Sequence, residues 1–230
     1  MLLRRFTKHV KDQNWFAVWL DVCVVVVGIF LGLQMSEWNQ GRQDVKWERE
    51  FLQDLRGELE RDLEHLNSVI EFQSSKGERL RVAKMQLEIG GEPATNEFAK
   101  QYDAAVLGNN TFFPANGVYQ SALTSGRIEL IRDKKLRYRI MNLYGHYYVR
   151  FMYNGEIYDH RVETVALEQR SYFDPDLRTF VLWDSGVSGE VSANLAFLIR
   201  ENEIYVGLAR ALEEEVSGII SNLESDSTMR

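Results

Sequence analysis

The chain has 230 residues, with 27 Lys and Arg against 34 Asp and Glu and a formal net charge of -7. This acidic balance, without a basic recognition motif, argues against nucleic acid as a partner. The single cysteine, Cys23, excludes an intramolecular disulfide.

The first 14 residues carry four basic side chains against one acid, Asp12. The apolar stretch that follows them is a candidate membrane span, and basic residues beside such a span favour a cytoplasmic location for their side of it. Three basic residues on the far flank, Arg42, Lys46 and Arg49, are interleaved with acids. We therefore interpret residues 1–14 as a basic cytoplasmic segment.

The stretch from Trp15 to Met35 is almost entirely apolar and contains one charge, Asp21. At about 1.5 Å per residue it reaches about 30 Å, the thickness of a bilayer's hydrocarbon core. A core helix of a soluble protein is the alternative, but such a helix would need burial on all sides. The run exceeds the apolar region of a signal peptide, and no A-x-A-like cleavage site follows it. We therefore assign residues 15–36 to a transmembrane helix that anchors the chain in a lipid bilayer.

Asp21 lies about 9 Å inside one end of this span, which costs on the order of 1 to 3 kcal/mol unless the carboxylate is protonated, hydrated or paired. At 100° per residue it shares one line with Gly28, Gly32 and Asn39. The two glycines form a GxxxG pair, which lets two backbones approach closely. The stripe predicts a helix-packing face and a homo-oligomer. The alternative is that Asp21 reaches nearby headgroups and the glycines are incidental.

From Glu37 to Ile89 the sequence lacks proline and repeats apolar residues at intervals of three and four. The repeating residues are Trp47, Phe51, Leu55, Leu59, Leu63, Leu66 and Ile70. This pattern predicts a long amphipathic helix continuous with the span. Gly90, Gly91 and Pro93 are expected to stop it.

The remaining helices are expected at about Asn96–Leu107, from Asn116 to Gly126, from Asp133 to about Tyr172 and from about Ser192 to Asn222. Asn116 and Asp133 are the expected N-caps, and residues 177–191 are expected to form a loop. The predicted fold class is all-α, with one transmembrane helix that continues into an extramembrane bundle of long, coiled-coil-like helices. The bundle domain covers residues 37–224, and residues 225–230 are expected to be a disordered tail.

Three parts of the sequence carry a family resemblance. They are the acid before Val25–Gln34 with Trp38 and Asn39, the block Val118–Gly126 with Ile128–Ile131 and Leu136-Arg137, and the tail Asn194–Leu223. With these residues the chain resembles a family of uncharacterised bacterial single-span membrane proteins. The resemblance implies a shared architecture and no activity. The membrane acid here is Asp21, where the family pattern leads us to expect Glu.

Two sets of side chains have the one-face spacing of metal sites in helix bundles: Asp62 with His65, and Glu156 with His160 and Glu163. Neither set forms the paired Glu-x-x-His motifs of a complete site, so solvated faces are the favoured reading. The sequence also lacks a phosphate loop, a nucleophile elbow and a paired Cys/His signature. We therefore predict no metal, no cofactor and no enzymatic activity.

The third long predicted helix is rich in tyrosine and begins with a basic cluster. Its tyrosines, at positions 144, 147, 148, 153 and 158, are expected to pack in the core and at its rim rather than to form a ligand cage. The basic residues are Arg132, Lys134, Lys135, Arg137 and Arg139. A solvated face is the favoured reading of this cluster, with anionic lipid or an acidic partner as the alternatives.

These features predict a single-pass, membrane-anchored helical interaction or scaffold protein that oligomerises through its span and binds an unidentified protein partner. Two alternatives remain. One is an ion-coupled, stator-like component that uses Asp21, and the other is an extracytoplasmic sensor of a small ligand. The expected location is the bacterial inner (cytoplasmic) membrane, with the N-terminus cytoplasmic and the C-terminal domain periplasmic or otherwise extracytoplasmic.

Overall fold

The computed structural model describes residues 15–89 and 96–228, with the side chains of all of these except 15–18, Asp21, 96–97 and 226–228. The chain divides into two compact units, Met1–Glu50 and Phe51–Arg230. Two predicted segments lie outside the described residues: the basic cytoplasmic segment 1–14 and the helix stop at 90–93.

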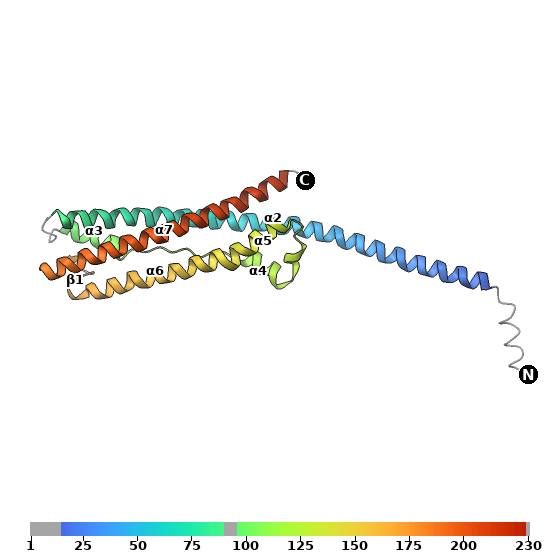
Figure 1. Cartoon of the computed structure of the whole chain (residues 1–230), viewed down its shortest axis with the longest axis horizontal. Coiled ribbons are helices and arrows are strands. Elements are labelled where there is room, and N and C mark those ends of the chain that lie inside the picture. The colour runs from blue at the N-terminus through green and yellow to red at the C-terminus, as the bar shows by residue number, and fades with distance from the viewer. Residues whose placement is uncertain (1–14, 90–95, 229–230) are drawn as a thin grey trace, which may run out of the picture. The chain divides into compact units, whose positions relative to one another are not determined.

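The first helix, α2, extends from Trp15 to Glu88 and confirms the predicted continuity of the apolar segment with the amphipathic helix (Figure 1). In the second unit its buried face includes Leu55, Leu59 and Leu66, as expected from the spacing. Leu63 is only half-buried, while Asp62 is buried in its place. The apolar pattern missed this position because it counts only hydrophobic residues.

Two short helices follow: α3 is Asn96–Val106 and α4 is Gly117–Thr124. Both match the expected positions. The 3-10 turn η1, Arg127–Leu130, comes next, after Gly126 in the left-handed region at φ 70°. The predicted capping by Asn116 is wrong, because its side chain makes no cap hydrogen bond.

The third long predicted helix is present as α5 (Lys134–Asn142), the π-helical segment η2 (Leu143–Tyr147), α6 (Tyr148–Glu168) and the 3-10 turn η3 (Gln169–Ser171). Asp133 caps α5 as predicted, because its carboxylate accepts hydrogen bonds from the backbone N–H groups of Lys135 and Leu136. The π-helical segment was not predicted.

The π-helical segment η2 adjusts the phase of the buried stripe. Before it, the buried residues Leu136, Ile140 and Leu143 follow the four-three spacing of an α-helix core. The next residue in that spacing is Tyr147, which is half-buried, whereas Tyr144 inside η2 and Tyr148 after it are both buried and lead to Phe151. A π turn holds about one residue more than an α turn, so it accommodates the extra residue and keeps one continuous face in the core.

The region after η3 differs from the expected loop. Two two-residue strands, β1 (Phe173–Asp174) and β2 (Thr179–Phe180), pair antiparallel. The last helix, α7, begins at Ser185 rather than near Ser192, so Gly186 and Gly189 lie inside it. The Asp184 carboxylate accepts a hydrogen bond from the Val187 N–H and supplies the cap that the glycine-based reading overlooked.

The C-terminal boundary also moves. Helix α7 continues to Thr228, so the tail predicted to be disordered from residue 225 is helical through most of its length.

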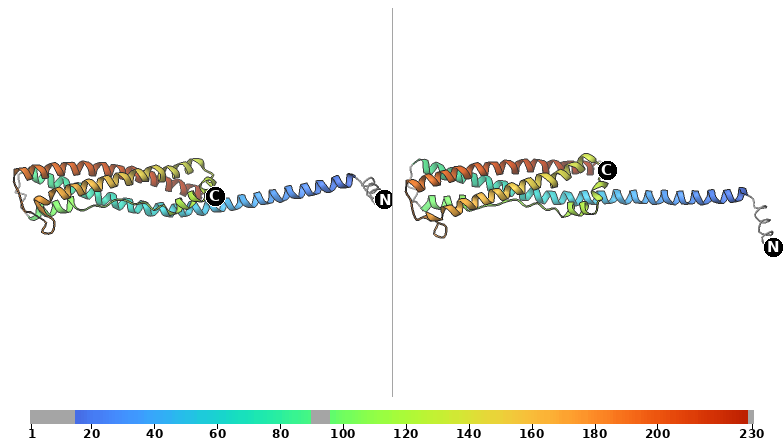
Figure 2. Two further views of the ribbon diagram at one scale, coloured as in Figure 1. Left: turned by 90° about the horizontal axis from the view of Figure 1, so that it is seen from below. Right: turned by 60° about the horizontal axis from the view of Figure 1, so that its bottom comes forward.

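Figure 2 shows α2, α6 and α7 running alongside one another in the second unit. Aromatic rings fill the space between α6 and α7: Tyr205 stacks on Phe151 at 4.9 Å and on Tyr158 at 5.1 Å between ring centroids. The all-α fold is therefore as predicted.

Because η2 holds about one residue more than an α turn, it should tolerate the loss of one residue. Gly145 is exposed, and a Cβ added to it would meet nothing within 4 Å. Deleting Gly145 should convert η2 to α-helix, keep both halves of the buried stripe in phase and leave a cooperative thermal transition measured by circular dichroism. Deleting Asn154 from α6 instead rotates the stripe by about 100° and should abolish that transition. Equal damage from both deletions would contradict the phase argument.

Candidate functional site

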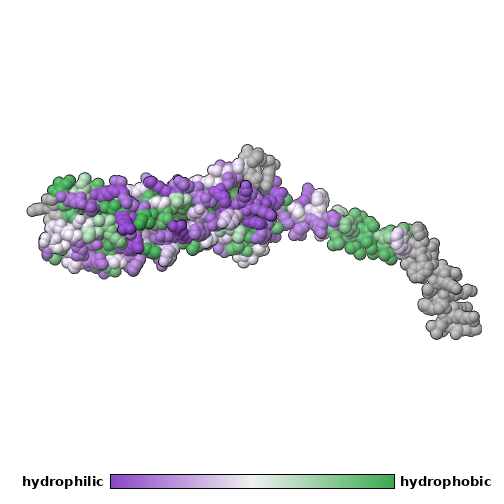
Figure 3. Space-filling view, viewed as in Figure 1, coloured by the Kyte–Doolittle hydropathy of each residue, from purple (hydrophilic) through white to green (hydrophobic). Residues whose placement is uncertain are grey.

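The apolar segment of α2 is uncovered by the rest of the described chain. Its large apolar side chains from Trp19 to Met35 are 48% to 68% exposed. The most apolar 18-residue window has a mean hydropathy of 1.5, and none of it is buried. Figure 3 shows this segment as a hydrophobic band. A core helix of a soluble domain would be covered, so the described structure does not support that alternative. One helix is thus long and apolar enough to cross a membrane.

The predicted packing face lies on this segment. Cβ atoms added at Gly28 and Gly32 would meet nothing within 4 Å, and Asn39 is exposed. The backbone of Asp21 belongs to α2, but its side chain lies outside the described residues. No described element of the same chain packs against the glycines, so the face is open to lipid or to a second chain. Its role in packing stays a prediction.

In the second unit, two acids one turn apart on α2 form matching contacts. The Glu58 carboxylate accepts hydrogen bonds from the Tyr144 hydroxyl at 2.9 Å and from the Val118 N–H at 3.1 Å. The Asp62 carboxylate accepts from the Tyr148 hydroxyl at 2.7 Å and from the Ala115 N–H at 2.9 Å. Both acids are buried, so these four donors replace the water that each carboxylate loses. We call this set the carboxylate–tyrosine network.

This network explains the missing cap at Asn116. Val118 is the second residue of α4, and its N–H is one of the donors that a helix N-terminus leaves without an intrahelical partner. The Glu58 side chain takes this bond from another helix, so α4 is capped by a tertiary contact. Burial raises the pKa of Asp62, although the Ala115 N–H and the Tyr148 hydroxyl act in the opposite direction. Burial and the neighbouring carboxylates raise the pKa of Tyr144 and Tyr148, which stay protonated and donate.

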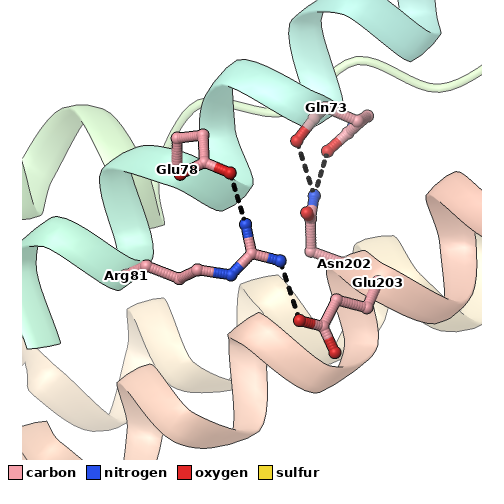
Figure 4. A network of polar contacts seen from close by, with 5 residues as sticks. All are labelled: Gln73, Glu78, Arg81, Asn202 and Glu203. Carbon is pink, nitrogen blue, oxygen red and sulfur yellow. Dashed lines mark hydrogen bonds and ion pairs between the residues drawn. The ribbon is translucent and has the colours of Figure 1, made fainter.

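A second network links α2 to α7 and to the segment after α3. The Asn202 amide donates to the backbone oxygen and the side-chain oxygen of Gln73, both at 3.0 Å (Figure 4). The Gln73 amide in turn donates to the Asn109 side chain at 2.8 Å. Nearby, Arg81 bridges Glu78 and Glu203, each at 2.7 Å. Because Gln73 and Asn202 are fully buried or nearly so, these amide contacts define one alignment of the helices.

Lys76 is the anomaly beside this network. Its side chain is 0% exposed, and its Nζ has no hydrogen-bond partner in the described part of the chain. The Nζ lies over the Tyr158 ring, 5.3 Å from its centroid. Burial lowers the pKa of Lys76 to about 8, while the Asp159 carboxylate opposes the shift and Arg79 adds to it. The ammonium is therefore held in the core at a cost in stability.

A shallow cleft of about 360 Å³ lies next to these residues. Its lining consists of Leu107, Asn109, Thr111, Asp159, Val162, Glu163 and Ala166. The Asp159 carboxylate already accepts hydrogen bonds from Asn109 and from Thr111, the latter at 3.2 Å. Asp159 and Glu163 in the lining oppose an anionic ligand, and Lys76, which interacts electrostatically with Asp159, opposes a cationic one. The cleft thus gives the sensor alternative no defined ligand.

The two proposed metal sets do not converge in the described residues. The solvated face expected for Asp62 is wrong, because this side chain is buried in the carboxylate–tyrosine network. The ring of His65 lies 5.2 Å from that of Phe112. His160 and Glu163 are both largely exposed on α6. No group of three His, Cys, Asp or Glu side chains able to hold a metal occurs in the part of the chain that the structure describes.

Four buried polar residues were not predicted from the sequence: Glu58, Gln73, Lys76 and Asn202. One signal was available: Glu58, Asp62, Gln73 and Lys76 continue the four-three spacing of the apolar residues on α2. Polar residues at such core positions specify the alignment of helices in coiled coils. Of the tyrosines, 144, 148 and 158 are buried as expected, and Tyr153 is 64% exposed.

Removing the buried charge at position 76 should stabilise the fold. The pKa of Lys76 is 10.5 in the unfolded chain and about 8 in the folded protein. At pH values between these two, the unfolded state binds more protons than the folded state. The free energy of unfolding therefore rises as the pH rises from 8 to 10.5. Lys76→Met should raise the free energy of unfolding at pH 7 by on the order of 2 to 3 kcal/mol. The gain should be smaller at pH 10, because Lys76 is then largely neutral in the folded protein. Urea unfolding at both pH values measures this, with Lys100→Met, at an exposed position of α3, as control. A loss of stability at pH 7 would contradict the account.

Comparison with known proteins supplies a family. A model described as a family of unknown function (DUF6090) matches residues 21–187. No curated protein and no solved structure matches the chain. The matched range begins at Asp21 and includes most of the apolar segment, all of the carboxylate–tyrosine network and Lys76. Since it covers well over half of the 230 residues, the chain belongs to this family of unknown function.

Proposed function

We propose that the protein is a single-pass, membrane-anchored interaction or scaffold protein. The observation that carries this proposal is the contrast between the two units. The helical bundle buries its own aromatic and aliphatic core, whereas the apolar segment around Val22–Met35 has no cover within the described chain. A bilayer would remove this segment from water, and a helix satisfies its own backbone hydrogen bonds there.

A binding role fits the bundle better than catalysis. The buried acids Glu58 and Asp62 are occupied by donors from the same chain. In the cleft of about 360 Å³, the Asp159 carboxylate is already bonded to Asn109 and Thr111. In this proposal the bundle presents surfaces to a protein partner, without a cofactor or a catalytic group.

The proposed location is the bacterial inner membrane with the N-terminus in the cytoplasm. The support is the sequence itself: four Lys and Arg stand among the first 14 residues, directly before the apolar segment. The bundle would then lie outside the cytoplasm.

Anchoring is tested by placing charges in the apolar segment. Val26→Lys with Phe30→Lys should release the protein from carbonate-washed membranes, because two lysines near the centre of a span cost several kcal/mol. A reporter that is active only outside the cytoplasm, fused after Asn222, should be active in the wild type and silent in this variant.

The matched control is Val82→Lys with Met85→Lys, which changes two exposed apolar residues of the bundle. It should stay in the membrane with an active reporter. A wild-type chain that is washed off by carbonate would overturn anchoring, and a silent reporter on a retained chain would reverse the proposed orientation.

Self-association through the span is tested at the glycines. Gly28→Leu with Gly32→Leu should keep two backbones apart and weaken association of the full chain in bilayers, by roughly 1 to 3 kcal/mol as measured by energy transfer. Leu31→Ala, which is off the stripe, should change it less. Equal association of the wild type and the double leucine variant would rule out this face.

A further inference from the structure

The bundle carries an exposed apolar stripe along α5, η2 and α6. We define it by six residues on the outer face of these helices: Tyr138, Met141, Gly145, Val149, Met152 and Tyr153. Tyr138 is 70%, Val149 53% and Tyr153 64% exposed, and both methionines are more than a third exposed. Isolated apolar residues are common on protein surfaces, but these recur at helical spacing over about 22 Å of helix.

The π-helical segment η2, Leu143–Tyr147, lies in the middle of this stripe, between Met141 and Val149. π-Helical segments occur frequently at functional sites.

The stripe lies in a strongly basic stretch of an acidic chain. Residues 134–154 contain five Lys and Arg and no Asp or Glu, although the chain carries a net charge of -7. Two of the five are neutralised within the bundle: Arg137 pairs with Glu129 at 2.7 Å and Arg139 with Glu215 at 3.1 Å. The other three, Lys134, Lys135 and Arg150, are exposed and form no ion pair with any described residue.

We propose that this stripe is the docking surface for an acidic amphipathic helix of a different protein. The partner helix packs its apolar face on the stripe, as helices dock through anchors spaced three and four apart. Its acids face Lys134, Lys135 and Arg150. The inference rests on the proposed interaction function and names the surface and the partner's chemistry.

Charge and composition favour this occupant over two others. A second copy that docks the same stripe in parallel sets these lysines against each other, which is repulsive. The stripe also has the composition of a protein interface, in which Tyr, Met and Arg are enriched while Asp and Glu are depleted. A bilayer surface is attracted by the same cations, so lipid is a separate outcome of the test.

The test is photocrosslinking of the full-length chain in its membrane. A p-benzoylphenylalanine residue replaces Val149, and in a matched sample it replaces Arg210, an exposed residue of α7. Adducts are separated by mass, and the crosslinked peptides are sequenced by mass spectrometry. The expected result is a discrete protein adduct from position 149 and not from position 210, with the crosslink in an acidic, amphipathic segment.

The charge requirement is tested in the same sample. Lys134→Glu with Lys135→Glu should lower the adduct yield by at least about tenfold, because acids then face acids. Arg200→Glu on α7 is the control and should leave the yield unchanged. Circular dichroism melting should show that both variants remain folded.

Several outcomes would overturn the proposal: adducts only with a second copy, adducts only with lipid, equal adducts from positions 149 and 210, or a yield unaffected by the charge reversal. All of these leave the carbonate extraction result unchanged. Failure of the stripe is therefore distinguishable from failure of membrane anchoring.

Discussion

The structure of the bundle depends on two buried carboxylates on α2. Glu58 and Asp62 each accept one hydrogen bond from a tyrosine and one from the backbone around the start of α4. These bonds attach α4 and the η2–α6 junction to the same turn of α2. Without them the two buried tyrosine hydroxyls would lack acceptors, at about 1 to 3 kcal/mol for each. The network therefore specifies one arrangement of three segments that are distant in sequence.

The second network has the same physical logic. The Gln73–Asn202 amide pair fixes α7 against α2 at one height, because any sliding would leave buried amide groups unpaired. Lys76 is different, since its buried ammonium has no hydrogen-bond partner in the described residues and reduces stability. Polar groups at core positions thus define the helix alignment at a cost in free energy, a trade known from coiled coils.

The two uncovered apolar surfaces have different chemistry. The segment Val22–Leu33 is apolar around its whole circumference, as a helix surrounded by lipid must be. The stripe on α5, η2 and α6 is narrow and bordered by Lys134, Lys135 and Arg150, as a surface for one partner helix would be. The first surface suits a bilayer, and the second suits a defined protein partner, as the proposed function requires.

The sequence by itself determined the helical class, the continuity of α2, the position of α3 and the cap at Asp133, because each follows from local spacing or from a side chain close in sequence. Only the tertiary structure decided the cap of α4, the π-helical phase shift and the burial of Lys76. Glu58 is 60 residues from Val118, so no local pattern at Asn116 reveals that a distant carboxylate takes its place. The start of α7 was missed for a related reason, since the Asp184 cap outweighs the two glycines that suggested a loop. Local propensity fixes the elements, but the partners of buried polar groups depend on which helices meet.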